Sequence, residues 1–176
     1  MSNKKELIGL SREELTAELQ NIGEKPFRTK QLWQWLYFHG VTDFEKMSNL
    51  SKDLRKKLAD NYTITRPKIV AEQISVDKAH KWLLEFSDGQ RVEMVYIPEE
   101  ETGAVCISTQ VGCAMGCKFC HTGSQKLTRN LSAGEIVLQF MLARDSYGEW
   151  PSPTNEIRHL ANIVVMEIGR ASCRER

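Results

Sequence analysis

The sequence contains no long hydrophobic run, and this absence excludes several classes of protein at the outset. No apolar stretch approaches the roughly 18 residues of a membrane-spanning helix, so no membrane association is expected. The opening residues, Met-Ser-Asn-Lys-Lys-Glu-Leu, lack the apolar core of a signal peptide, which leaves the cytoplasm as the expected location. Internal repeats and low-complexity segments are also absent. The sequence therefore predicts a soluble, globular, cytoplasmic protein.

Excess charge of one sign is likewise missing. The 176 residues include 24 Lys and Arg against 23 Asp and Glu, which gives a formal net charge of +1. Composition alone therefore does not indicate a nucleic-acid binder. Two local basic clusters are each expected to form a solvated helix face or, alternatively, an RNA-facing patch. They are Lys25, Arg28 and Lys30, and then Lys52, Arg55, Lys56 and Lys57.

The first sixty residues carry helical patterns. Ser11 and Glu14 form a capping box, in which each side chain satisfies the other's free backbone N–H at the start of a helix. A second helix is expected over about 28–39, ended by Gly40, and Ser51 is placed to cap a third that reaches about residue 62. The second helix is dense in aromatic residues, which suit either the core of a small helical domain or a platform on which bases stack.

The pattern changes after Pro67 to strands and one further helix. Alternating and apolar runs predict strands over 68–76, 80–86, 91–97, 104–110 and 160–166. A second capping box, Ser132 with Glu135, opens a helix that runs to about Arg144. A strand, a loop, a helix and a strand in succession form a βαβ unit, so the sequence predicts an α/β protein with a parallel sheet.

Cysteine occurs five times, and three of the five lie within eight residues, as Cys113-Ala-Met-Gly-Cys117-Lys-Phe-Cys120. In a reducing cytosol such a cluster more often binds metal or does chemistry than forms disulfides. Three thiolates spaced four and then three residues apart suit three corners of a 4Fe–4S cluster, which normally takes four cysteines. The fourth iron would then be open to the amino and carboxylate groups of S-adenosylmethionine.

Structural zinc is the competing interpretation of this motif, with His121 as a fourth ligand. Closed zinc sites usually take their four ligands as two separated pairs. Zinc would also leave the strand before the motif and the capped helix after it unexplained. The position of the motif, at the end of the first strand of a βαβ unit, favours the cluster, because ligands in such folds sit at the carboxyl ends of parallel strands.

Several segments in order give the chain a family resemblance over about residues 7–166. It resembles the dual-specificity ribosomal and transfer RNA methyltransferases, radical S-adenosylmethionine enzymes that methylate carbon 2 of adenine. The matching segments are Pro26-Phe27-Arg28-Thr29-Lys30-Gln31, Met47-Ser-Asn-Leu-Ser51, Lys81-Trp82-Leu83, Tyr96-Ile97-Pro98, Cys106-Ile-Ser-Thr-Gln-Val-Gly-Cys113, Arg129-Asn-Leu-Ser-Ala-Gly-Glu-Ile136 and Asn162-Ile-Val-Val-Met166.

The resemblance implies a domain plan and an activity. Residues 1–66 would form an accessory helical domain, 67–101 a β-hairpin extension, and 102–166 the start of a truncated radical S-adenosylmethionine partial (βα) barrel. The substrates would be large-subunit ribosomal RNA and transfer RNA, and an electron donor such as flavodoxin would reduce the 4Fe–4S cluster. Two rivals differ from this activity in substrate or class: a sister enzyme that methylates carbon 8 of adenine, and a non-catalytic RNA-binding module. A third rival is a radical enzyme whose substrate is not a nucleic acid. The resemblance of the N-terminal segments to the methyltransferase family argues against this rival.

Family roles carry over to five residues of this sequence. Cys113, Cys117 and Cys120 match the cluster ligands. Glu93 matches the family's proton acceptor, although a surface glutamate on a hairpin strand is the plainer alternative. Cys106 matches a cysteine that is thought to help resolve a protein–RNA adduct through a transient disulfide, although a small thiol on a buried strand often simply packs.

The resemblance ends after Met166, where the family continues with Gly-Met-Gly-Glu-Pro. This chain instead reads Glu-Ile-Gly-Arg-Ala-Ser-Cys-Arg-Glu-Arg over residues 167–176. A widely used sequencing adapter, preceded by one G, encodes these same ten residues. The sequence therefore predicts a non-native tail, no role for Cys173, and a fragment that is inactive as written.

Overall fold

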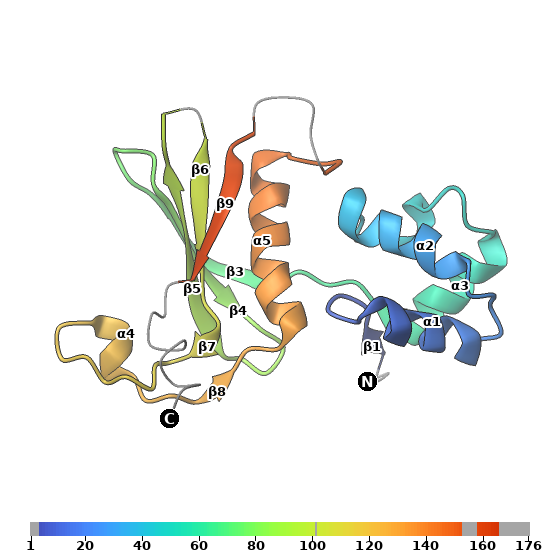
Figure 1. The fold of residues 1–176 in the computed structure, drawn as a ribbon, viewed down its shortest axis with the longest axis horizontal. Helices are drawn as coiled ribbons and strands as arrows, with labels where there is room; N and C mark the ends of the chain where they lie inside the picture. The colour runs from blue at the N-terminus through green and yellow to red at the C-terminus, as the bar shows by residue number, and fades with distance from the viewer. Residues whose placement is uncertain (1–3, 101, 153–157, 166–176) are drawn as a thin grey trace. The chain divides into compact units, whose positions relative to one another are not determined.

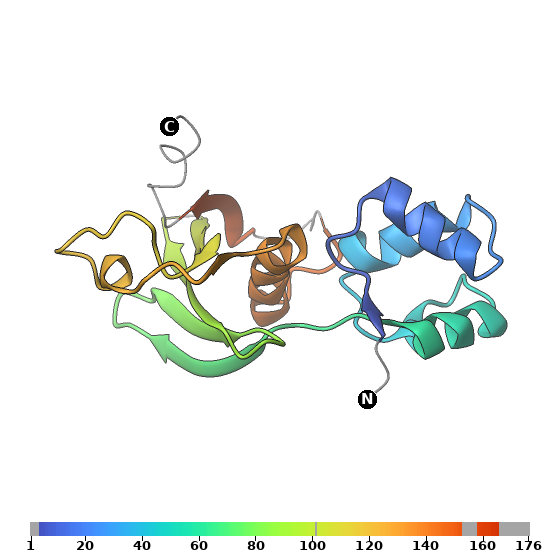
Figure 2. The same ribbon diagram turned by 90° about the horizontal axis from the view of Figure 1, so that it is seen from below.

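The computed structural model describes residues 4–100, 102–152 and 158–165. The expected tail at 167–176, and Met166 before it, lie outside the described residues. The chain divides into two compact units, one of residues 1–66 with 148–155 and the other of residues 67–147 with 156–176. Figures 1 and 2 show the helices of the first unit in blue to cyan and the sheet of the second in green to red. No helix among the described residues is long and apolar enough to cross a membrane.

The first unit is helical, and two of its helices begin with the caps that the local sequence predicted. Its elements are β1 (Lys5–Glu6), α1 (Arg12–Asn21), α2 (Arg28–Trp33), the π-helix η1 (Gln34–Phe38), the 3₁₀-helix η2 (Phe44–Lys46), α3 (Lys52–Asn61) and β2 (Tyr62–Thr63), with β1 and β2 paired in parallel. The Glu14 N–H donates to Ser11 Oγ at 3.1 Å, and the Ser11 N–H donates to Glu14 Oε2 at 2.7 Å. At the start of α3, the Leu54 N–H donates to Ser51 Oγ, which is a single capping bond. Both predicted caps are therefore confirmed.

The expected second helix is present but changes its winding halfway. After Trp33 the α-helix becomes the π-helix η1, in which the His39 N–H reaches back five residues to the carbonyl of Gln34 at 3.0 Å. Leu32 and Leu36 are buried, whereas the neighbouring aromatic side chains are half-buried. Gly40 ends the helix with a φ of +64°, the left-handed conformation that glycine adopts without strain.

The second unit is built on a five-stranded sheet in the order β3-β4-β5-β6-β9. Its strands are β3 (Lys68–Ile74), β4 (His80–Glu85), β5 (Arg91–Pro98), β6 (Gly103–Ile107) and β9 (Leu160–Val165). The first four follow one another as an antiparallel meander, and β9 pairs with β6 in parallel after the helix α5 (Ala133–Tyr147). The mixed α/β fold and its parallel βαβ step are as predicted. The strands expected as a separate hairpin extension share one sheet with β6 and β9.

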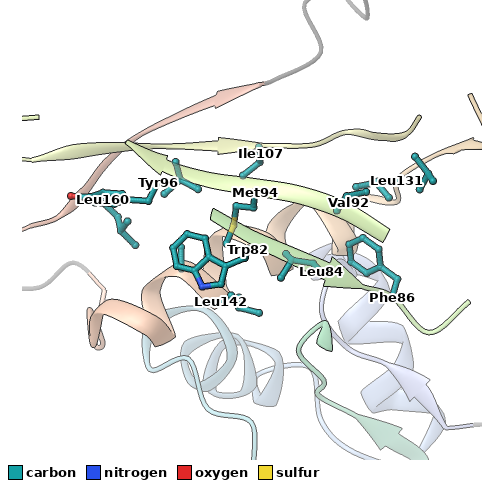
Figure 3. Close-up of a cluster of buried hydrophobic side chains, with 13 residues drawn as sticks. Trp82, Leu84, Phe86, Val92, Met94, Tyr96, Ile107, Leu131, Leu142 and Leu160 are labelled. Carbon is teal, nitrogen blue, oxygen red and sulfur yellow. The ribbon is translucent and has the colours of Figure 1, made fainter. Parts of the chain in front are cut away.

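One face of this sheet holds the core. On β5, Val92, Met94 and Tyr96 are buried, and they alternate with more exposed residues, as the sequence pattern predicts. Trp82 and Leu84 of β4 join them, and α5 covers this face with Leu142 and Ala143 (Figure 3). The side chains that alternate with this set point to the opposite face. This opposite face carries Glu93 and Cys106.

The strand expected over 104–110 is interrupted, and a distant side chain explains why. It ends as β6 at Ile107, and only Gln110–Val111 resumes as the short β7. Between them, the Ser108 N–H donates to Gln139 Oε1 at 2.9 Å and Gln139 Nε2 donates to the Ser108 carbonyl at 2.8 Å. Because a fully buried amide from α5 occupies both backbone groups, Ser108 cannot continue the ladder. The prediction of one continuous strand was wrong at this point.

Candidate functional site

The three clustered cysteines lie on one loop between β7 and the short helix α4 (His121–Ser124). All three are half-buried thiols. The loop is closed at its base, where the Cys113 N–H donates to the Gln125 carbonyl at 3.3 Å and Cys113 forms a β-bridge with Lys126. The three cysteines of the motif therefore lie on a single loop whose two ends are held together at its base.

Backbone hydrogen bonds shape this loop around its sulfur atoms. The Cys120 N–H donates to the Cys117 carbonyl at 3.1 Å, a tight turn that keeps these two residues close. The Met115 N–H approaches Cys113 Sγ at 3.5 Å, a weak donor–sulfur contact. Such N–H donors to cysteine sulfur are among the features that tune iron–sulfur clusters. Among the described residues, Cys113 is one cysteine for which the structure shows such a contact.

Gly123 allows α4 to close against the loop. A Cβ at this position would lie 2.7 Å from the Cys117 carbonyl oxygen and 2.9 Å from its nitrogen, closer than side-chain atoms approach backbone. We therefore expect Gly123→Ala to displace Cys117 and to reduce iron uptake of the chain several-fold on anaerobic reconstitution. Ser124→Ala, one residue further along the same turn, is the matched control. Equal iron content in the two variants would contradict the role given to Gly123.

Three cysteine thiols are suitable ligands for a metal group bound by thiolates. In this structure their side chains do not point to a common centre. Among the described residues, no three His, Cys, Asp or Glu side chains are placed to hold a metal ion. His121, which a zinc site would need as its fourth ligand, is exposed on α4 and joins no such group. The loop does offer three half-buried thiols on a backbone held at its base.

Glu93 and Cys106 lie on the second face of the sheet, away from the core. Val95 pairs with Cys106 across β5 and β6, and paired residues share a face, so Cys106 is on the same side as Val95 and Glu93. Cys106 is half-buried and also pairs with Val164 of β9. Ser108, which follows β6, donates its hydroxyl to the Glu93 carbonyl at 2.9 Å. The structure thus brings both residues to one face.

The Glu93 carboxylate has a cation beside it. Lys81 of β4 donates to Glu93 Oε1 at 3.1 Å, and both side chains are nearly half exposed. A solvent-exposed ion pair of this kind contributes little to stability, about 0–1 kcal/mol. The Glu93 carboxylate is therefore accessible and only loosely held by Lys81.

Sequence reasoning missed a polar network centred on Arg129. This residue lies in β8 (Arg129–Asn130), which pairs with β7 at the base of the cysteine loop. Its guanidinium donates to both oxygens of Glu135 at 2.9 and 2.8 Å, and its Nε donates to Asp88 Oδ2 at 2.7 Å. The sequence did predict one part, the capping box of Ser132 and Glu135, which is confirmed at 2.7 and 3.2 Å. Nothing in local spacing connected Arg129 to Asp88.

The charges of this network favour one another. The hydrogen bonding of Arg129 to the Glu135 carboxylate is the largest cause that raises the pKa of Arg129 above its ordinary value. Burial acts to raise the pKa of Glu135 and of Asp88, but hydrogen bonds to their carboxylates outweigh it, so both pKa values are lowered. Carboxylates with lowered pKa values stabilise the fold above their ordinary range near pH 4 and lose that effect as the pH falls through their folded-state values. The network is therefore fully charged at neutral pH.

Comparison with known proteins gives a consistent match along the chain. Residues 5–64 match the RlmN_N family, described as the ribosomal RNA large subunit methyltransferase N-terminal domain. The chain is 60% identical over 169 residues to the dual-specificity RNA methyltransferase RlmN of Paramagnetospirillum magneticum, covering 95% of this chain and 37% of that protein. It is also 60% identical over 163 residues to the protein of the same name from Rhodospirillum rubrum, covering 93% of this chain and 38% of that protein.

A solved structure agrees with these matches. The crystal structure of a radical SAM methyltransferase from Sphaerobacter thermophilus superimposes with a TM-score of 0.77 at 35% identity, and covers 92% of this chain and 47% of that one. The present chain thus spans less than two fifths of the length of the two curated relatives and less than half of the structural one. The α/β fold described above corresponds to part of a larger domain.

Proposed function

The chain belongs to the RlmN family of dual-specificity RNA methyltransferases, and from this premise we propose that it is part of a radical S-adenosylmethionine enzyme that methylates carbon 2 of adenine. The proposed substrates are large-subunit ribosomal RNA and transfer RNA, in the cytoplasm. The observation that carries the proposal is the loop with three thiols at the carboxyl end of β6, on a βαβ unit of the matching fold.

Cys113, Cys117 and Cys120 are the residues proposed to hold a 4Fe–4S cluster. A cluster held there would supply the electron for reductive cleavage of S-adenosylmethionine. The three thiols that would hold it are half-buried. An electron donor such as flavodoxin is proposed to reduce the cluster.

Glu93 is proposed to accept the proton that leaves adenine carbon 2. Its carboxylate is accessible, and Lys81 donates to Oε1 at 3.1 Å. Cys106, on the same face, is proposed to assist the release of the methylated RNA. By the same proposal, residues 1–66 form an accessory domain, 67–101 a hairpin extension and 102–166 the start of the barrel.

A graft tests the proposed function. Residues 1–165 would replace the corresponding segment of the full-length Rhodospirillum rubrum relative, and the modified base would be identified by mass mapping. Methylation at carbon 2 is expected. Methylation at carbon 8 would instead identify the sister activity, and RNA binding by a folded, cluster-loaded graft without methylation would identify a non-catalytic RNA-binding module.

In the same graft we expect Glu93→Gln to cleave S-adenosylmethionine at a normal rate but to lose about 10²–10⁴-fold in release of methylated RNA. Glutamine keeps the shape of the side chain and loses the base, so radical formation survives while deprotonation fails. Glu99→Gln, which alters an exposed carboxylate just after β5, is the control. Unchanged turnover by Glu93→Gln would remove this residue from the mechanism.

A further inference from the structure

The cysteine loop belongs to a larger excursion of the chain, residues 112–128, which we call the cysteine lobe. Figure 1 shows the lobe with α4 (gold) projecting from the sheet beyond β7 and β8. Its stem is the ribbon of β7 and β8, which consists of only two residues on each strand, Gln110 with Asn130 and Val111 with Arg129. The stem is anchored by Val111 and the adjoining Leu131, which lie in the core cluster, and the Cys113–Lys126 bridge continues it into the lobe.

Arg129 adds to this anchoring a side-chain connection from the stem to distant segments of the chain. It joins three segments: its own stem strand, the first turn of α5 through both oxygens of Glu135, and the turn between β4 and β5 through Asp88. The Arg129 side chain is 31% exposed, and Glu135 is 18% exposed. Planar, paired donation of this kind fixes orientation as well as distance, which a lysine in the same place would not do.

The Asp88 end of the connection leads directly to the strand that bears Glu93. Asp88 Oδ1 accepts from the Gln90 N–H at 3.1 Å and so shapes the turn, while Oδ2 accepts from Arg129 at 2.7 Å. The turn opens into β5, on which Glu93 follows shortly. The two oxygens of one carboxylate therefore serve different partners, one inside the hairpin and one on the stem of the lobe.

We propose that Arg129 is a positioning residue, which holds the cysteine lobe in a fixed orientation to the β4–β5 hairpin and its Glu93. This inference rests on the proposed function, because orientation matters only if the thiols and Glu93 serve one reaction. In that reaction, the site of radical formation and the proton acceptor must meet the same adenine ring. The connection through Asp88 fixes one relative to the other without touching either.

Asp88→Asn tests this connection in the full 176-residue chain. Asparagine retains an oxygen for the Gln90 N–H and loses the charged acceptor for Arg129. The chain offers a matched control in Asp77→Asn, because Asp77 accepts from the Ala79 N–H at 3.1 Å in the neighbouring hairpin turn. Amide hydrogen exchange would be measured in the chain without metal, together with the alkylation rates of Cys113, Cys117 and Cys120.

We expect Asp88→Asn to speed both exchange and alkylation within the lobe about three- to tenfold, with α5 and β4 unchanged, and Asp77→Asn to leave the lobe as it was. Arg129→Lys, which keeps the charge and loses the paired geometry toward Glu135, should speed both at least as much as Asp88→Asn. A uniform acceleration across the whole second unit would overturn positioning in favour of general stability. Lobe rates equal to those of Asp77→Asn would overturn it outright.

The same variants separate this inference from the proposed function. After anaerobic reconstitution with iron and sulfide, the rate of iron loss to a chelator should rise in Asp88→Asn by a similar factor. If wild type takes up no iron, the cluster assignment fails while the exchange measurement still decides whether Arg129 orients the lobe. If iron binds but exchange in the lobe is unaffected, the positioning role alone is wrong.

Discussion

Anaerobic reconstitution of this chain with iron and sulfide should yield about four irons per chain and a brown chromophore. Changing any one of Cys113, Cys117 or Cys120 to Ala should abolish both. A cluster that already has only three thiolates would keep two after any one substitution, too few to anchor it. Iron analysis and the visible absorption spectrum, measured on the same samples, provide the test.

Cys106→Ala is the matched control for this experiment, because Cys106 is also a half-buried thiol but lies on β6, within the sheet. It should retain wild-type iron content. Stoichiometric zinc with no uptake of iron would contradict the cluster, as would a loss of chromophore in Cys106→Ala as large as in the other three variants.

Trp82→Ala should have the largest effect on the stability of the second unit. Trp82 is 0% exposed, stacks on His80 with ring centroids 3.7 Å apart, and lies at the centre of the core in Figure 3. Removing a buried indole leaves a cavity as well as unburied apolar surface, so a loss of about 3–5 kcal/mol in the free energy of unfolding is expected. Exchange of the β4 and β5 amides measures this quantity for the second unit separately.

Two further variants sharpen this prediction. Trp82 Nε1 is buried and has no hydrogen-bond partner among the described residues, so Trp82→Phe discards an unsatisfied donor and should cost less than Trp82→Ala. Phe119→Ala removes an aromatic ring that is 93% exposed and should change the free energy of unfolding by no more than about 0.5 kcal/mol. A loss below about 1 kcal/mol in Trp82→Ala would contradict the central place given to this side chain.

The features that the sequence predicted depend on residues close together in the chain, and the features that it missed depend on residues far apart. The caps at Ser11, Ser51 and Ser132 depend on residues within four positions, and all three are present. The alternation on β5 needed only the strand itself. The end of β6 depends on Gln139, 31 residues away, and so no local pattern revealed it.

The candidate site divides in the same way. Spacing alone identified the three thiols as a ligand set. Only the structure showed that their loop is closed at its base and that Gly123 lies close to the backbone of Cys117. Glu93 and Cys106 came from the family resemblance, and only the strand register placed them on one face. Arg129 and Asp88, 41 residues apart, carried no signal in the sequence that linked them.

The order of strands in the sheet has a consequence for how the chain folds during synthesis. Strands β3, β4, β5 and β6 are neighbours both along the chain and in the sheet, so each can pair as soon as it leaves the ribosome. The β6–β9 pair is different, since it closes a long loop that contains the cysteine lobe and α5, and the entropy of that closure must be overcome first. We therefore expect the parallel step to form last, with β6 an open edge until β9 pairs with it.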